Sequence, residues 1–379
     1  MWLVISSPKS ARRRCPVVVD LANAQAGVAA ATADNVLEVR NLTKHFPVGG
    51  IVDKKVVHAL EDVSFSLPRG EVVAVVGESG SGKSTTARML ARLIPPTSGE
   101  IFYNGDDVLK TESRGASLAY RGDVQMVFQD PFGSLNPVHP IRYHLERPLK
   151  IHKKTKGRRE TRDRVIELLE TVGLDPAAEV AARYPYQLSG GQRQRVAFAR
   201  ALAVEPKVML ADEPVSMLDV SIRIGVLNLI DRLRAERGIS FLYITHDIAS
   251  ARYIADKTNV MYAGRMVEGA ESIGLIEEPA HPYTKLLLSA VPNPHAGLLT
   301  QEAPIRGEIP SLIDPPPGCP FEPRCPYAMD VCKQTMPGIS WLSDRHWVRC
   351  HLYPEGEAAR GQASKIVETM ATQKASRDT

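Results

Sequence analysis

Three short apolar runs, each followed by polar residues, predict buried strands of an α/β domain. They are Val72–Val76, Val208–Ala211 and Phe241–Ile244. Apolar runs of this length without alternation are typical of strands that are buried on both faces of a parallel sheet. Stretches of helical composition alternate with them, among them Thr86–Leu93 and Arg193–Leu202. We therefore expect a mostly parallel sheet that is flanked by helices.

A further helical region is predicted between the first and second of these strands. Arg162–Val172 has apolar residues at i, i+3 and i+4 and ends at Gly173. Proline and glycine dominate 303–327, which indicates a boundary within the C-terminal part of the chain.

Composition and charge narrow the class of protein. The chain has 379 residues, 44% of them hydrophobic, which favours one large α/β domain with an appendage. Its net charge of +4 at pH 7 is mild and spread out, so we expect no nucleic-acid partner. No apolar stretch approaches the roughly 20 residues that a membrane-spanning helix needs. Any association with a membrane is therefore expected to come through partner subunits.

The segment that follows the first apolar run has the phosphate-binding pattern G-x-x-x-x-G-K-S/T between a strand and a helix. Glycines let the backbone curl until successive N–H groups point at phosphate oxygens, and the helix N-terminus adds positive potential. Lys83 is expected to reach the β- and γ-phosphates, and the hydroxyl of Ser84 to bind Mg²⁺. The predicted nucleotide-binding residues are Gly77, Ser79, Gly80, Ser81, Gly82, Lys83, Ser84 and Thr85.

A second phosphate cradle is predicted about 105 residues later. Leu188–Gln192 reads Leu-Ser-Gly-Gly-Gln and opens an amphipathic helix, so it offers backbone donors and a serine hydroxyl to an anion. One chain needs only one cradle for its own γ-phosphate. We therefore expect ATP to be held between two molecules, one of which contributes Ser189, Gly190, Gly191 and Gln192.

Polar side chains at the ends of three other strands suit the hydrolysis of that nucleotide. Asp212 is expected to bind Mg²⁺, and the neighbouring Glu213 to orient an attacking water. His246 and Gln129 also follow apolar runs, and strands of a parallel sheet present their C-terminal ends together. His246 is thus a candidate sensor of the γ-phosphate.

With these motifs in this order, the chain resembles an ATP-binding subunit of an ABC transporter. The resemblance implies a P-loop NTPase fold of ABC type, with an antiparallel β subdomain, a helical subdomain and ATP hydrolysis as its activity. It also implies that Gln129 contacts Mg²⁺ and that Asp219 belongs to the D-loop. Phe46 matches the family's aromatic residue that stacks on adenine, although any strand edge also favours an aromatic side chain. The catalytic residues that the resemblance implies are Glu213, His246 and Gln129.

Two segments resemble the oligopeptide/dipeptide importer branch, namely Gln125–Pro137 and His281–Leu288. His58–Phe65 looks more like the second of that system's two ATPases. The branch implies a paralogous ATP-binding subunit, two transmembrane permeases, an extracytoplasmic substrate-binding protein, and a position on the cytoplasmic face of the membrane. Ile244–Tyr253 also resembles importers of oligosaccharides, so the solute stays open. A soluble ABC ATPase is the alternative, but such proteins usually carry two nucleotide domains or a coiled-coil insertion.

The resemblance divides the chain into four parts. A disordered N-terminal extension is expected at 1–36, the nucleotide-binding domain at 37–275 with its helical subdomain at about 131–195, a C-terminal domain with the cysteines at 276–354, and a disordered tail at 355–379.

Four cysteines form a second candidate site. They have the spacing C-x5-C-x6-C-x17-C, and an intracellular ATPase has little use for structural disulfides, which favours a metal. Zinc sites usually carry paired C-x2-C turns, which are missing here, whereas four thiolates on a loop-rich segment suit an iron–sulfur cluster. The importer branch implies a 4Fe-4S cluster in some members. Zinc, with His346 and His351 as spare ligands, and plain thiols remain as alternatives. The expected ligands are Cys319, Cys325, Cys332 and Cys350.

We expect this cysteine site to be independent of the nucleotide site, because the two lie in different parts of the chain.

Overall fold

The structure is a computed structural model that describes residues 34–49, 55–112, 115–291, 310–357 and 360. Most of the N-terminal extension expected at 1–36 and most of the tail expected at 355–379 lie outside these residues. Within the described part, the first strand begins at Asn35, and Gly356 is still hydrogen-bonded to Ile339 and Trp341.

The central element is an eight-stranded sheet with the strand order β11-β12-β10-β9-β3-β8-β7-β6. Its strands from β9 to β6 run parallel, and β10, β11 and β12 join by antiparallel pairing. The parallel strands are β3 (Val72–Val76), β6 (Val124–Val127), β7 (Val208–Asp212), β8 (Ser240–Thr245) and β9 (Lys257–Tyr262). The antiparallel ones are β10 (Arg265–Glu271), β11 (Ser340–Ser343) and β12 (His346–Val348). Every residue of β3, β7 and β8 is buried, as the apolar runs predict.

A second, four-stranded sheet lies over one face of the first, in the strand order β2-β1-β4-β5. It is antiparallel throughout. Its strands are β1 (Asn35–Val48), β2 (Lys55–Pro68), β4 (Ser98–Tyr103) and β5 (Asp106–Asp107). The short helices α2 (Val108–Thr111) and α3 (Leu118–Asp123) follow it. This is the antiparallel β subdomain that the resemblance implies.

Side chains of β3 alternate between two apolar cores, one on each face of the main sheet. Val73 and Val75 pack with the antiparallel sheet and with α1 (Lys83–Leu90), the helix that follows the P-loop. Val72, Ala74 and Val76 pack on the other face, with helices α8 (Gly190–Leu202), α9 (Val220–Arg237) and α10 (Ile248–Ile254). The alternation is the period of two that a strand imposes. It fixes the P-loop between two layers.

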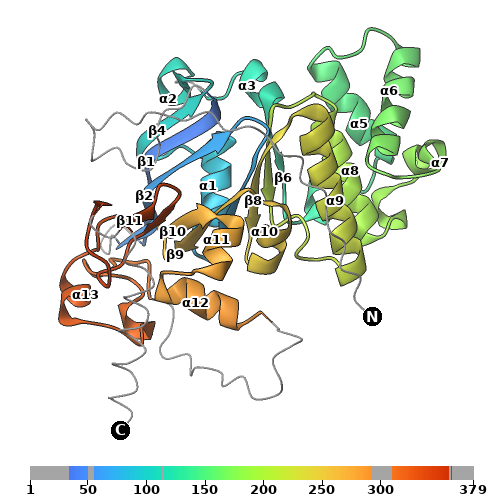
Figure 1. Ribbon diagram of the computed structural model, residues 1–379. Coiled ribbons are helices and arrows are strands. Elements are labelled where there is room, and N and C mark those ends of the chain that lie inside the picture. The colour runs from blue at the N-terminus through green and yellow to red at the C-terminus, as the bar shows by residue number, and fades with distance from the viewer. Residues whose placement is uncertain (1–33, 50–54, 113–114, 292–309, 358–359, 361–379) are drawn as a thin grey trace, which may run out of the picture.

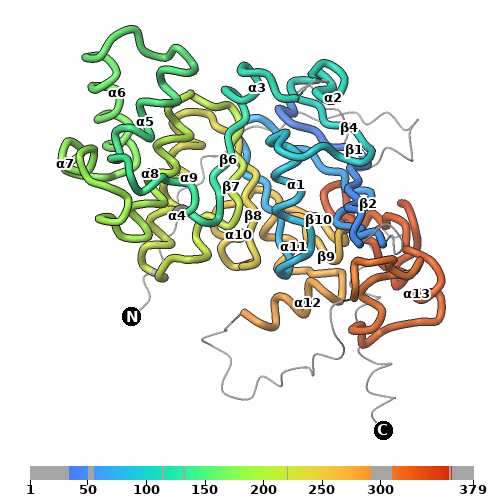
Figure 2. Tube along the Cα trace, turned by 180° about the vertical axis from the view of Figure 1, so that it is seen from behind, coloured from blue at the N-terminus to red at the C-terminus, as the bar shows by residue number. Residues whose placement is uncertain are grey.

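Helices project from the end of the sheet that carries β6, shown in green in Figures 1 and 2. They are α4 (Pro131–Ser134), α5 (Ile141–Ile151), α6 (Arg158–Thr171) and α7 (Ala177–Ala182), with the single-turn η1 (Pro185–Gln187). Helix α8 returns the chain from this bundle to the sheet. The helical subdomain of the resemblance is therefore present, and the helix that begins at the second phosphate cradle extends to Leu202.

The C-terminal part forms the opposite end of the molecule (Figure 2). Helices α11 (Ser272–Glu277) and α12 (Pro282–Ser289) precede the cysteines, and η2 (Glu322–Arg324) and α13 (Asp330–Gln334) lie among them. Strand β12 then pairs with β10, where Trp347 lies opposite Gly269. The C-terminal part is thus continuous with the main sheet, which the sequence did not indicate.

Candidate functional site

The P-loop has a backbone that only glycine accommodates at two positions. A Cβ atom on Gly77 would lie 2.1 Å from the carbonyl oxygen of Met261. Gly82 has φ 106° and caps α1, and a Cβ there would lie 2.7 Å from the carbonyl oxygen of Ala59. The close approach of strands on both sides therefore forces the curled backbone, which leaves N–H groups at the mouth of the loop.

Lys83 and Ser84 lie where a triphosphate and its metal need them. The ammonium of Lys83 donates to the carbonyl oxygens of Gly77 and Glu78 at 2.7 and 2.8 Å. Burial lowers the pKa of Lys83, and nearby carboxylates oppose that shift. The hydroxyl of Ser84 donates to Asp212 at 2.8 Å. Burial raises the pKa of Asp212, because the charged carboxylate is poorly solvated. A cation bound at this position would stabilise the charged carboxylate.

Glu213 is the centre at which the predicted catalytic side chains meet. Its Oε2 accepts from Nε2 of Gln129 at 3.0 Å and lies 3.3 Å from Nδ1 of His246. Its Oε1 lies 4.0 Å from Nζ of Lys83. Glu213 itself has φ 45°, a left-handed conformation that is unfavourable for this residue type. The strands β6, β7 and β8 and the P-loop thus bring four distant residues to one point.

These residues line a cavity of about 550 Å³. The size suits a nucleotide. Among the described residues, the buried Oγ of Ser81 in the P-loop has no hydrogen-bond partner, as expected of a cradle that receives an anion. The hydroxyl of Ser84 and the carboxylate of Asp212 are hard oxygen ligands that fit Mg²⁺. The lining consists of Ala59, Glu78, Ser79, Gly80, Gly82, Lys83, Ser84, Thr85, Gln129, Glu213, His246 and Leu287.

The second phosphate cradle lies outside this lining. Ser189 caps α8, where its hydroxyl accepts from the N–H of Gln192, and the side chain of Gln192 accepts from the N–H of Ser189 in return. Gly191 packs against Ile222 of α9, and Asp219 is the N-cap residue of that helix. None of Ser189, Gly190, Gly191, Gln192 and Asp219 lines the chain's own nucleotide cavity.

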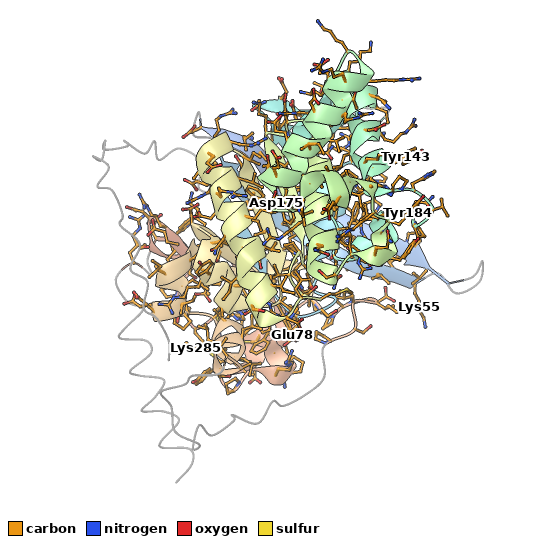
Figure 3. The ribbon with its side chains drawn as sticks, turned by 90° about the vertical axis from the view of Figure 1, so that its right-hand side faces the viewer. Lys55, Glu78, Tyr143, Asp175, Tyr184 and Lys285 are labelled. Atoms are coloured by element: carbon orange, nitrogen blue, oxygen red, sulfur yellow. The ribbon has the colours of Figure 1, made fainter. Side chains whose placement is uncertain are left out.

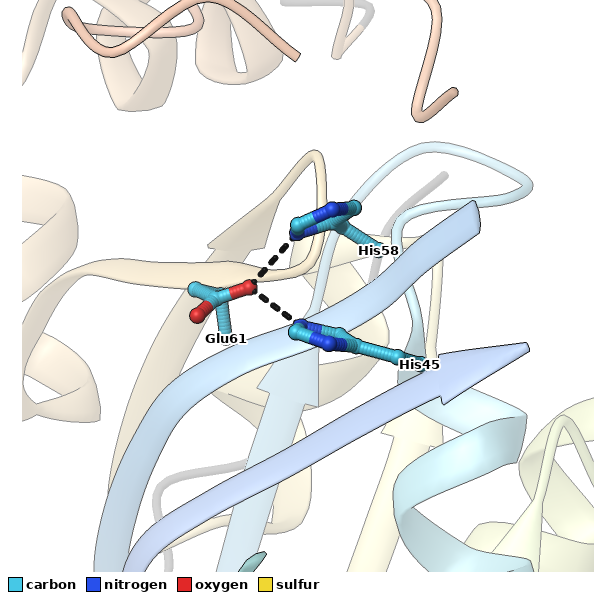
Figure 4. Close-up of side chains that lie close together, drawn as sticks. All are labelled: His45, His58 and Glu61. Carbon is cyan, nitrogen blue, oxygen red and sulfur yellow. Dashed lines mark hydrogen bonds and ion pairs between the residues drawn. The ribbon is translucent and has the colours of Figure 1, made fainter. Parts of the chain in front are cut away.

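Phe46, the predicted adenine-stacking residue, lies half-buried near the end of β1, with Nζ of Lys44 4.8 Å from its ring centre. Beside it, His45 and His58 both contact the same oxygen of Glu61, at 2.8 and 3.0 Å (Figure 4). Partial burial would raise the pKa of Glu61, but these two contacts hold it below its ordinary value. The three side chains satisfy one another and tie β1 to β2.

Cys319, Cys325, Cys332 and Cys350 form no disulfide and lie near one another in the C-terminal part. The N–H of Cys319 donates to the carbonyl oxygen of Cys332 at 2.7 Å. Burial raises the pKa of Cys319 and Cys325 to about 11 and that of Cys350 to about 12, and neighbouring thiolates add to the rise. Burial therefore favours the neutral thiol at Cys319, Cys325 and Cys350.

The positions of these sulfurs bear on the zinc alternative. Ligands of a single zinc ion at about 2.3 Å lie about 4 Å from one another. Within the described residues, no three of the cysteine sulfurs lie within 4.8 Å of one another. The two histidines that could be further zinc ligands have other partners. Nε2 of His346 lies 2.7 Å from Glu268, and Nε2 of His351 lies 2.9 Å from the carbonyl oxygen of Thr335. The four thiols are therefore not arranged around a single zinc ion.

The cysteine segment and the nucleotide site lie in different parts of the sequence, but the structure brings them into contact. Arg324, the residue before Cys325, forms a two-pronged ion pair with Glu78 of the P-loop at 2.9 and 3.0 Å. The N–H of Glu78 also donates to the hydroxyl of Tyr283 on α12 at 2.8 Å. In Figure 3, Glu78 accordingly lies beside the orange and red C-terminal ribbon. The two residues are 246 positions apart in the chain, so no local pattern in the sequence indicates this contact.

Comparison with protein families gives two matches. The family model "ABC transporter" matches residues 60–216, and "Oligopeptide/dipeptide transporter, C-terminal region" matches residues 267–332.

Relatives match over nearly the whole chain. The oligopeptide transport ATP-binding protein AppF of Bacillus subtilis is 43% identical over 86% of this chain and 99% of its own length. The dipeptide transport ATP-binding protein DppF of Escherichia coli is 44% identical over 80% of this chain and 90% of its own length.

Among solved structures, the ATP-binding cassette MJ0796, as a dimer in a post-hydrolysis state with ADP and Pi, is 30% identical with a TM-score of 0.54. That similarity covers 62% of this chain and 98% of MJ0796. The fold class predicted from the sequence is confirmed, and so is its enzymatic class, an ATPase. The chain belongs to the ATP-binding proteins of ABC transporters, in the oligopeptide/dipeptide family.

Proposed function

We propose that this chain drives an ABC importer whose solutes are oligopeptides or dipeptides. The observation that supports this class of solute is the extent of the similarity. It includes the C-terminal region at residues 267–332 as well as the ATPase motifs. The oligosaccharide alternative rests on one short segment, Ile244–Tyr253, by contrast.

Two nucleotide-binding domains close head to tail in this proposal, each P-loop facing the partner's second phosphate cradle. Glu213 orients and polarises the attacking water, and His246 contacts the γ-phosphate at the same point. Mg²⁺ would be held by Ser84, Asp212 and Gln129, and when bound it supplies charge that stabilises the leaving phosphate. Gln129 lies at the join between β6 and the helical subdomain, so loss of phosphate can move those helices.

The partners follow from the same proposal. They are a paralogous ATP-binding subunit, two transmembrane permeases and an extracytoplasmic substrate-binding protein. No helix in the part of the chain that the structure describes has the length and apolar character to cross a bilayer. The permeases would therefore hold this subunit at the cytoplasmic face of the membrane, through its helical subdomain.

A 4Fe-4S cluster held by Cys319, Cys325, Cys332 and Cys350 is part of the proposal. Four free thiols that lie near one another on a loop-rich segment support it. When bound, the cluster would cross-link the segments that carry the four cysteines.

Purification of the subunit from detergent-solubilised membranes tests the importer proposal. A tagged chain should bring down two membrane permeases and a second ATP-binding subunit. A tagged chain that stays wholly in the soluble fraction, without permeases, would favour a soluble ABC ATPase instead.

A further inference from the structure

The contact between Arg324 and Glu78 is more than a surface ion pair. The Arg324 side chain is only 6% exposed, and both of its terminal nitrogens reach the carboxylate. Its guanidinium also lies 5.7 Å from the ring centre of Tyr262 and 5.8 Å from that of Phe321. Because the pair is bidentate and largely dry, removal of one partner leaves a poorly solvated charge behind.

Glu78 adds a negative charge to the P-loop at the nucleotide cavity. It lines the nucleotide cavity, and its carbonyl oxygen accepts a hydrogen bond from Lys83. A carboxylate in this place repels phosphate oxygens unless another group neutralises it. Arg324 supplies that positive charge from outside the P-loop, and it also fixes the direction in which the carboxylate points.

Arg324 is held by a short loop with a predicted metal ligand at each end. The loop runs from Cys319 to Cys325, and η2 forms its middle. Phe321 anchors it in the core, with its ring centre 5.3 Å from that of Tyr262 and 5.5 Å from that of Tyr283. Any change at the two thiols therefore acts on the loop that carries Arg324.

We propose that Arg324 is a positioning residue for ATP binding, which couples the cysteine loop to the P-loop by neutralising and orienting Glu78. Nucleotide affinity then depends on the conformation of the cysteine loop. This goes beyond the proposed importer function, because it requires only that the chain binds ATP.

The first test is a double-mutant cycle on the full-length chain, read out as the Kd for a fluorescent ATP analogue with Mg²⁺. Arg324→Gln should weaken binding by at least about tenfold, because the carboxylate is left uncompensated beside the phosphates. Glu78→Gln should change the Kd by less than about threefold. The double variant should bind within about threefold of the wild type. In the assembled complex, Arg324→Gln should raise the KM for ATP and leave kcat nearly unchanged.

The matched control is Arg345→Gln. Arg345 lies in the same C-terminal part, but its side chain is 71% exposed and its partner Glu271, unlike Glu78, does not line the cavity. The Arg345→Gln variant should bind the ATP analogue with the affinity of the wild type. Equal affinity in Arg324→Gln as well would overturn the proposal. So would a double variant that binds as weakly as Arg324→Gln alone, since rescue by Glu78→Gln requires that charge is the cause.

A second test starts from the cysteine end. Cys325→Ser should weaken binding of the analogue when Glu78 is present and have a smaller effect in the Glu78→Gln background. Thermal unfolding of each variant shows whether the fold is kept, and Arg324→Lys, which keeps the charge but only one prong, should fall between wild type and Arg324→Gln. An equal effect of Cys325→Ser in both backgrounds would contradict coupling through this ion pair.

Discussion

At the scale of single residues, the site is defined by its charges and by one strained backbone. Glu213 adopts φ 45° while its N–H donates to the carbonyl oxygen of Ile244 at 2.9 Å. That hydrogen bond to the neighbouring strand helps to hold the residue in a conformation that its type disfavours. The carboxylate is thereby turned towards Gln129 and His246, where a water must be oriented.

Replacement of Glu213 by glutamine keeps the shape of the side chain and removes the base. ATP binding should persist while turnover in the assembled complex falls by at least about a hundredfold. Phosphate release measures the rate, and the exposed Glu236→Gln on α9 is the matched control, with wild-type turnover. Unchanged turnover in Glu213→Gln would remove this residue from the catalytic group.

At the scale of elements, the N-terminus of α8 determines which nucleotide Ser189 can contact. The hydroxyl of Ser189 caps α8, and Ser189 does not line the chain's own cavity. We therefore expect Ser189 to meet the phosphate of a nucleotide that a second molecule binds.

Ser189→Arg should leave ATP binding by the isolated chain intact and block ATP-dependent association of the two nucleotide-binding subunits. Light scattering with and without ATP measures that association. Ser117→Arg is the control, because Ser117 is also an exposed N-cap serine, at α3, so the cost of losing a cap is matched. A loss of ATP affinity in isolated Ser189→Arg would place this serine in the chain's own pocket instead.

Helix α12 carries a buried histidine that makes stability depend on pH. His281 is 1% exposed, and its Nδ1 accepts from the N–H of Tyr283 at 3.0 Å. Burial lowers the pKa of His281 to about 4. Between its ordinary pKa of 6.5 and this value, the unfolded chain binds a proton that the folded chain does not. The free energy of unfolding should therefore fall with decreasing pH in this window, by at most roughly 1.4 kcal/mol per pH unit from this group.

His281→Asn keeps an acceptor at the N-cap position but cannot titrate. Denaturant unfolding from pH 7 to pH 5 should show a shallower loss of stability in this variant than in the wild type, whatever its stability at pH 7. A slope equal to that of the wild type would show that His281 does not titrate on unfolding.

At the scale of the whole molecule, the sequence predicted the ATPase part well and the C-terminal part poorly. The strands β3, β7 and β8 could be predicted because each is an unbroken apolar run, and the P-loop because its spacing is strict. The pairing of β12 with β10 and the contact of Arg324 with Glu78 depend on residues far apart in the chain. Such pairs have no local pattern, so only the folded structure reveals them.

The cysteine site makes a prediction that concerns the assembled C-terminal part. Anaerobically purified protein should be brown and contain about four iron and four acid-labile sulfide atoms per chain. Cys350→Ser should bleach it and loosen the surrounding loops, as measured by proteolysis. Colourless protein that contains one zinc per chain would show that the site binds zinc and not a cluster. Metal-free protein whose four thiols can all be alkylated would exclude both.

The central claim is that this chain hydrolyses ATP to import peptides, and solute uptake tests it most directly. The purified complex with its binding protein should be placed in vesicles that contain ATP, and uptake of a labelled oligopeptide compared with that of a labelled oligosaccharide. The account predicts ATP-dependent uptake of the peptide that is abolished by Lys83→Ala, because Lys83 is the buried cation of the P-loop. ATP-dependent uptake of the oligosaccharide with none of the peptide, or peptide uptake unaffected by Lys83→Ala, would contradict it.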